Sequence, residues 1–157
     1  MKKITILTFL ILNTFVHSQS KNETEKWIYE KINLYGFKDN QISHYYDITF
    51  EKGNIIVNDR SYVFNQIIVC KHIIPIKEID YFTFSENEDL IELSIYLNAK
   101  ILIKYKCNQE IDFKLTSGEY QFKLDKSFKN DDMINRMKKA FYNLIKLNGG
   151  KIKNEAY

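Results

Sequence analysis

The side chains of this sequence with the most chemical reactivity are few and lie far apart. Beyond the N-terminal segment, the histidines are His44 and His72, and the cysteines are Cys70 and Cys107. A nucleophile needs an adjacent base held by the fold. Neither histidine belongs to an HExxH pair, a Cys–His signature or a nucleophile elbow, and the sequence has no glycine-rich phosphate loop. We therefore predict no catalytic residue and no cofactor.

Each histidine also has an ordinary structural explanation. His44 falls on the apolar face of an alternating segment, which favours a satisfied histidine in the core or at its rim. His72 follows Lys71 near the end of a predicted strand, and we expect it to be solvated.

One cluster of possible oxygen ligands is the stretch SENED, where Glu86, Glu88 and Asp89 stand close together. A hard cation needs several oxygens that converge on one point, and this stretch lacks both the spacing and the glycine of a calcium loop. A solvated acidic turn is the favoured interpretation. We predict no metal site.

Tyrosines provide the remaining candidate surface. Tyr45, Tyr46 and Tyr62, together with His44, could line a groove for a glycan or a peptide. Tyrosine is also a good strand former on a half-exposed sheet, and this plainer explanation is favoured.

Cys70 and Cys107 leave two alternatives open. In an oxidising compartment they could form a disulfide that closes a long loop. They could equally be two separate buried thiols, since the sequence does not give the distance between their Cα atoms.

Residues 1–18 predict a secretory signal peptide, with basic MKK, the apolar run Ile4–Val16 and then a small residue, Ser18. Its removal would leave 23 − 2 = 21 Lys and Arg against 20 Asp and Glu, a net charge of +1. Near-neutral charge argues against nucleic acid as a partner. No second hydrophobic span follows. We therefore expect a periplasmic or secreted protein with no integral membrane insertion after cleavage.

The elements that must position these residues have a simple order. A helix is predicted over residues 22–35, capped by Asn22 or Thr24 and ended by Gly36. We expect it to pack one apolar stripe on the domain, with Trp27, Ile28, Lys31, Ile32 and Tyr35 near helical spacing. Residues 42–51 alternate as a half-buried strand, and the following EKGN predicts a tight hairpin. In all, about seven or eight short strands with polar turns such as NDRS predict an antiparallel meander that forms a sandwich or barrel.

The last element, from Asn130 or Asp131 to Gly149, is a predicted amphipathic helix. Met133, Met137, Phe141 and Leu144 form its apolar row. The basic opposite face would also suit a membrane surface, but an apolar face buried in the core is favoured. We expect one domain over residues 19–157: a helix and connection at 19–41, the meander and last helix at 42–151, and a tail at 152–157.

This order of helix, about seven strands and a final capping helix resembles a pleckstrin-homology-like barrel over residues 42–150. The ending RMKKAFYNLIKLNGGK is also similar to the tail of small secreted bacterial proteins of unassigned function. The resemblance implies an α+β fold and a scaffold for binding rather than a reaction. In phosphoinositide-binding relatives the first hairpin is basic, whereas here DITFEKGNIIV has Lys52 as its only base, so that ligand is not supported.

Three functions follow as hypotheses. The first is a non-enzymatic secreted binding module for an unknown protein, peptide or glycan, working through a sheet edge or the groove between a strand and the C-terminal helix. The second is an envelope hydrolase or carbohydrate-active protein whose site has no sequence signature. The third is a hydrophobic-ligand carrier that uses the barrel interior.

Overall fold

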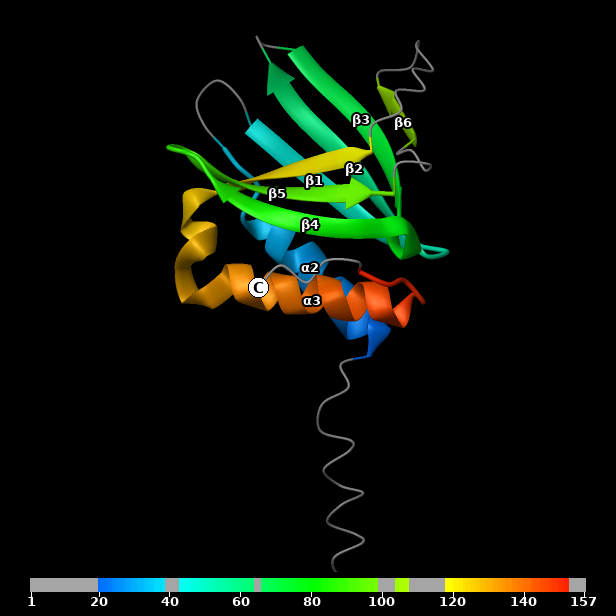
Figure 1. The fold of residues 1–157 in the computed structure, drawn as a ribbon. Coiled ribbons are helices and arrows are strands. Elements are labelled where there is room, and N and C mark those ends of the chain that lie inside the picture. Colours follow the sequence, from blue (N-terminus) through cyan, green and yellow to red (C-terminus); the bar gives the residue numbers. More distant parts are fainter. Residues whose placement is uncertain (1–19, 39–42, 64–65, 99–103, 108–117, 153–157) are drawn as a thin grey trace, which may run out of the picture.

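The computed structural model describes residues 20–38, 43–63, 66–98, 104–107 and 118–152. Within these ranges the protein is α+β, with two antiparallel sheets and two α-helices (Figure 1). Several predictions fall outside the described residues: the signal peptide, the strand segments at 100–103 and 110–115, and most of the tail.

Helix α2 covers Lys21–Leu34 and begins one residue earlier than the sequence predicted. Its cap is Ser20, whose Oγ accepts a hydrogen bond from the Glu23 N–H at 3.2 Å, while the Glu23 carboxylate accepts from the Ser20 N–H at 2.8 Å. This reciprocal pair satisfies two N–H groups that the first helical turn leaves free. The predicted caps, Asn22 and Thr24, lie inside the helix instead.

Four strands form the first sheet, in the order β1-β2-β3-β6. They are β1 (Ser43–Glu51), β2 (Asn54–Val63), β3 (Gln66–Pro75) and β6 (Lys104–Cys107). The hairpin predicted at EKGN is confirmed, with Lys52 and Gly53 both at positive φ. The turn predicted at NDRS is wrong, because residues 58–61 pair with β1 on one side and β3 on the other.

The second sheet has the order β4-β5-β7. Its strands are β4 (Ile79–Glu86), β5 (Leu90–Leu97) and β7 (Glu119–Asp125). A 3-10 turn, Ile76–Glu78, follows Pro75 and leads the chain from the first sheet into the second. After β5 the chain returns to the first sheet as β6 and then comes back as β7. The prediction of one meander closed into a barrel is therefore wrong for the described strands.

Helix α3 covers Met133–Leu147 and follows the 3-10 segment Lys126–Asp132. Asp131 and Asp132 both have φ 55°, and the helix starts after them rather than at Asn130. The predicted apolar face is confirmed, since it is buried. Its buried residues are Met133, Met137, Ala140, Phe141, Leu144 and Ile145.

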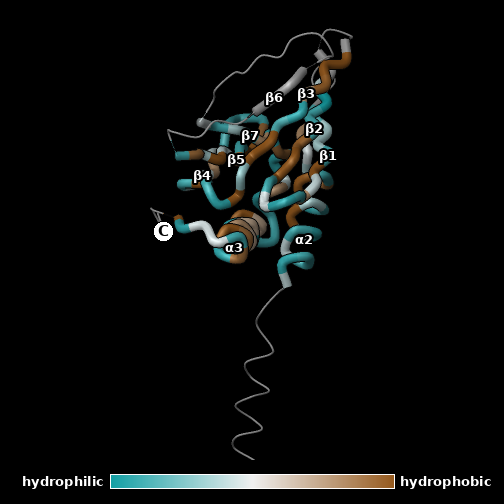
Figure 2. The backbone as a smooth tube through the Cα atoms, turned by 90° about the vertical axis from the view of Figure 1, so that its right-hand side faces the viewer, coloured by the Kyte–Doolittle hydropathy of each residue, from teal (hydrophilic) through white to brown (hydrophobic). Residues whose placement is uncertain are grey.

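Both helices lie on the same side of the two sheets, with α2 below β1 and α3 below β4 (Figures 1 and 2). They also touch each other, and the Asn143 side chain donates to the buried Thr24 Oγ1 at 2.9 Å. Burial of each large apolar side chain in the shared core contributes about 1.5–3 kcal/mol before ordering costs. None of the helices in the described ranges has the length and apolar character needed to span a membrane.

Candidate functional site

Strand β1 lies at an edge of its sheet, and the described residues cover only the first half of that edge. The His44 N–H points away from β2 and donates to the Phe37 carbonyl at 2.9 Å. The register between β1 and β2 is unbroken. In such a ladder the backbone groups of every second residue point to the same side. The N–H and C=O groups of Tyr46, Ile48 and Phe50 therefore face this same edge.

The second half of the edge is open. Beyond His44, the Tyr46 hydroxyl accepts a hydrogen bond from the backbone N–H of Lys123 in β7, at 2.8 Å. In the described part of the chain, the outward backbone groups of Ile48 and Phe50 have no hydrogen-bond partner. An unpaired strand edge is a template for another extended chain.

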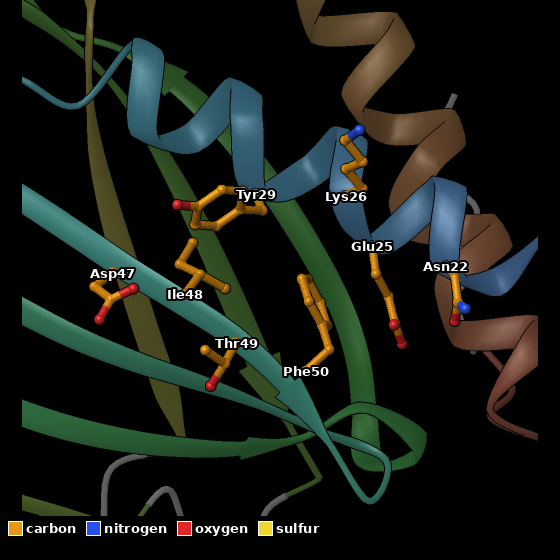
Figure 3. A pocket seen from close by; sticks show the side chains of 8 residues that line it. All are labelled: Asn22, Glu25, Lys26, Tyr29, Asp47, Ile48, Thr49 and Phe50. Atoms are coloured by element: carbon orange, nitrogen blue, oxygen red, sulfur yellow. The ribbon is translucent and has the colours of Figure 1, made fainter.

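A groove of about 420 Å³ lies beside this open edge, between α2 and β1 (Figure 3). Its floor is apolar: Ile48 is buried, Phe50 is partly buried, and the ring of Tyr29 reaches from α2 toward Ile48. Tyr29 remains 41% exposed although it is a large ring on a packed helix. The other side chains that line the groove are polar: Asn22, Glu25, Lys26, Asp47 and Thr49.

The charges of the groove come from both walls. On α2, partial burial raises the pKa of Glu25, although Lys21 lies 3.8 Å away and acts in the opposite direction. Lys26 lies 3.9 Å from Glu30 in a solvent-exposed pair. On β1, Asp47 accepts a 3.5 Å hydrogen bond from the side chain of Asn58.

A second polar cluster, formed by His44, Asp59 and Ser61, lies on the inner face of the first sheet. The Ser61 Oγ is 3.1 Å from His44 Nδ1, and the Asp59 carboxylate is 3.4 Å from the same nitrogen. In a serine-hydrolase triad the base contacts the nucleophile with one ring nitrogen and the orienting acid with the other. Here both groups share Nδ1, and the buried Nε2 contacts no partner in the described chain. This arrangement does not form a proton relay.

His72 also belongs to this inner polar region. The prediction that it is solvated is wrong, because its side chain is largely buried. Its ring lies 4.6 Å from that of Tyr120, and burial lowers its pKa, with the carboxylate of Asp59 acting in the opposite direction. Burial also raises the pKa of the hydroxyls of Tyr46 and Tyr120. These pKa shifts favour the neutral forms of His72, Tyr46 and Tyr120 near pH 7. The three side chains therefore behave as parts of the core.

Of the predicted surface residues, the structure brings His44 and Tyr46 together but places Tyr45 on the opposite face of β1. Tyr45 is exposed on the outer face of β1, where Lys38 lies over its ring. His44 and Tyr46 face inward and stack on each other. Tyr62 pairs through its backbone with Ser43, and its side chain lies outside the described structure.

The remaining candidates have structural roles. Cys70 is disulfide-bonded, and Cys107, the only other cysteine of the sequence, is its backbone partner across β3 and β6. In the acidic loop, Glu86 forms a 2.8 Å ion pair with Lys129. Among the described residues, no group of three or more His, Cys, Asp and Glu is placed to hold a metal ion.

Sequence reasoning missed the α2 wall of the groove, because the helix was expected only to bury an apolar stripe. Tyr29 was a usable signal: it is a large aromatic residue beside the buried Ile28 and outside that stripe. The position of α2 against the edge of β1 depends on tertiary packing, which the sequence pattern does not give.

Comparison with known proteins finds no matching family model, no matching curated protein and no matching solved structure.

Proposed function

We propose that this protein is a non-enzymatic binding module, exported to the periplasm or secreted, that takes up an extended peptide segment of a partner protein along the edge of β1. The observation that carries this proposal is the coincidence of two features. The unpaired backbone groups of Ile48 and Phe50 lie in the same groove that Tyr29 and the apolar side chains of β1 line.

Addition of a strand to this edge uses both features. The backbone of the incoming segment would pair with the free N–H and C=O groups of β1, which provides affinity with little dependence on sequence. Alternate side chains of the segment would enter the space between β1 and α2, which provides selectivity. We further propose that the pleckstrin-homology-like order of elements serves as a scaffold for binding, with the first sheet left open at the β1 edge.

The two other hypotheses have weaker support. A hydrolase would need a base between two different partners, and His44 offers a single ring nitrogen to both Ser61 and Asp59. A hydrophobic-ligand carrier would need space between the sheets, where buried side chains such as Phe122, Ile95 and Leu93 pack instead.

The test uses a capped, labelled peptide with the neutral extended sequence Thr-Val-Thr-Val-Thr. We expect it to bind and to slow hydrogen exchange at the amides of Ile48 and Phe50. Tyr29→Ala should weaken binding at least about fivefold, because an aromatic anchor is lost from the groove.

Leu34→Ala is the matched control, since Leu34 is 64% exposed on the same helix but does not line the groove. It should leave the affinity unchanged. Protection of amides elsewhere, without protection of Ile48 and Phe50, would overturn the proposal, as would equal losses in the two variants.

A further inference from the structure

Resting on the proposed function, we infer that the partner segment is basic and amphipathic, with two Lys or Arg residues four positions apart on either side of two apolar residues. In order along the segment, the five side chains are basic, apolar, any strand former, apolar and basic. The inference depends on five consecutive β1 residues, Asp47 to Glu51, of which all but Glu51 line the groove.

The outer face of this part of β1 carries two carboxylates. Asp47 and Glu51 are exposed and lie on the same face, with the exposed Thr49 between them. Within the described ranges, neither carboxylate forms an ion pair. On an added strand, the side chain opposite each of them would lie about 4.5–5.5 Å away between Cβ atoms, where opposite charges attract.

The inner face of the same five residues is apolar. Ile48 and Phe50 point toward α2, and Tyr29 lies above them (Figure 3). Successive side chains of a strand alternate between its faces. When the basic residues of the segment face Asp47 and Glu51, its second and fourth side chains therefore enter the apolar space between β1 and α2.

The other charges near the groove do not cancel this preference. Lys26 is the cation among the lining residues, and it lies beside Glu30 at 3.9 Å. Glu25 lies on the same wall, beside Lys21 at 3.8 Å. Lys52 is exposed in the hairpin turn, next to Glu51. The two carboxylates on α2, Glu25 and Glu30, have cationic neighbours. Asp47 and Glu51 on β1 form no ion pair within the described ranges, so both can pair with a basic side chain of the partner.

A second copy of this chain does not fit the site in the matching register. Antiparallel pairing of two β1 edges centred on Thr49 would place Asp47 of each copy opposite Glu51 of the other. Like charges directly opposite each other destabilise a strand pair. The proposed basic pattern is instead the charge complement of β1, and it is the same in both chain directions.

The experiment compares two capped, labelled peptides, Lys-Val-Thr-Val-Lys and Glu-Val-Thr-Val-Glu, by fluorescence anisotropy. At low salt we expect the Lys peptide to bind about tenfold more tightly, the size expected for two cross-strand charge pairs. The preference should shrink in about 1 M NaCl, where the Debye length is about 3 Å.

The double variant Asp47→Lys/Glu51→Lys should reverse the preference in favour of the Glu peptide. Glu88→Lys/Asp89→Lys is the control, because it changes the net charge equally in an exposed loop away from the groove. Circular dichroism would check that both variants fold.

The outcomes separate this inference from the proposed function. If both peptides bind equally and protect the amides of Ile48 and Phe50, the binding module stands and the basic partner is wrong. If neither peptide nor the neutral one binds, both proposals fail. Equal loss of the preference in the two double variants, or a stable dimer formed through β1, would also overturn the basic partner.

Discussion

The two halves of strand β1 have the same alternation of inward and outward side chains, but their edges differ. At His44 the edge is covered by the segment that connects α2 to the sheet, through a 2.9 Å bond to the Phe37 carbonyl. At Ile48 and Phe50 no such segment is present in the described structure, and a groove takes its place. The path of the neighbouring segment, rather than the residue types of β1, decides which half of the edge stays unpaired in the described structure.

Side-chain chemistry would have led to the opposite choice. The covered half has the histidine, with a serine and an aspartate beside it. The open half has Ile48, Thr49 and Phe50, none of which carries reactive chemistry. The proposed binding function thus depends on unpaired backbone groups, which no sequence motif records.

The largest expected effect is loss of the whole fold, which would abolish the covered and the open halves of the β1 edge together. Phe141→Asp places a carboxylate at a fully buried position of α3 and should destabilise the protein by at least about 4 kcal/mol. Urea unfolding followed by circular dichroism measures the change. Leu147→Asp on the same helix is the control, because Leu147 is 42% exposed. A folded Phe141→Asp protein of normal stability would mean that the apolar face of α3 is not part of the core.

Gly36→Ala should affect the covered half alone. A Cβ at Gly36 would lie 2.9 Å from the backbone oxygen of His44, so the covering segment must shift. We expect a loss of about 1–3 kcal/mol. Hydrogen exchange should become faster at the His44 amide and stay unchanged at Ile48. Gly118→Ala is the control, since its Cβ would make only an ordinary 3.8 Å contact. Equal acceleration at both amides would show that the halves are not independent.

Tyr46→Phe removes a hydroxyl that joins β1 of the first sheet to β7 of the second. The Lys123 N–H loses its acceptor, which should cost about 1 kcal/mol. Thermal unfolding of the variant measures the loss. Tyr81→Phe provides the comparison, because the Tyr81 hydroxyl has no hydrogen bond within the described chain. If both variants melt together with the wild type, the Tyr46 bridge contributes nothing.

The smallest expected effect is a pH dependence of stability that comes from His72 in the inner polar region. Burial lowers the pKa of His72 below its ordinary value of 6.5, so the folded protein resists protonation that the unfolded chain accepts. This contribution to stability is complete above pH 6.5 and is lost as the pH falls below that value. Urea midpoints at pH 7.5 and 5.5 should therefore differ, and His72→Gln should reduce the difference. A midpoint that rises on acidification would contradict the sign.

Local patterns predicted local structure well. The alternation His44, Tyr46, Ile48 and Phe50 does face inward, the EKGN hairpin forms, and the apolar row of α3 is buried. Each of these depends on spacing within one segment, which the sequence states directly.

Features set by distant segments could not be predicted in the same way. Asn58 to Ser61 have turn-like composition, but pairing on both sides keeps them in β2. His72 seemed solvated beside Lys71, yet its neighbour Tyr120 comes from another sheet. The groove belongs to this second group, because it requires both α2 and the edge of β1.

The hydrogen bond between Asn143 and Thr24 joins residues 119 positions apart, and it has a consequence for the order of folding. The pairings among β1, β2 and β3 are hairpin contacts between neighbours in the sequence, and such contacts form early. Helix α2, which forms one wall of the groove, is held by the Asn143–Thr24 bond to α3, the last helix of the chain. A folding intermediate with the β1, β2 and β3 hairpins formed but α3 not yet packed would therefore expose the β1 edge beside a helix that is not yet held in place. Under the proposed function, we expect peptide selectivity to be complete only after α3 has packed.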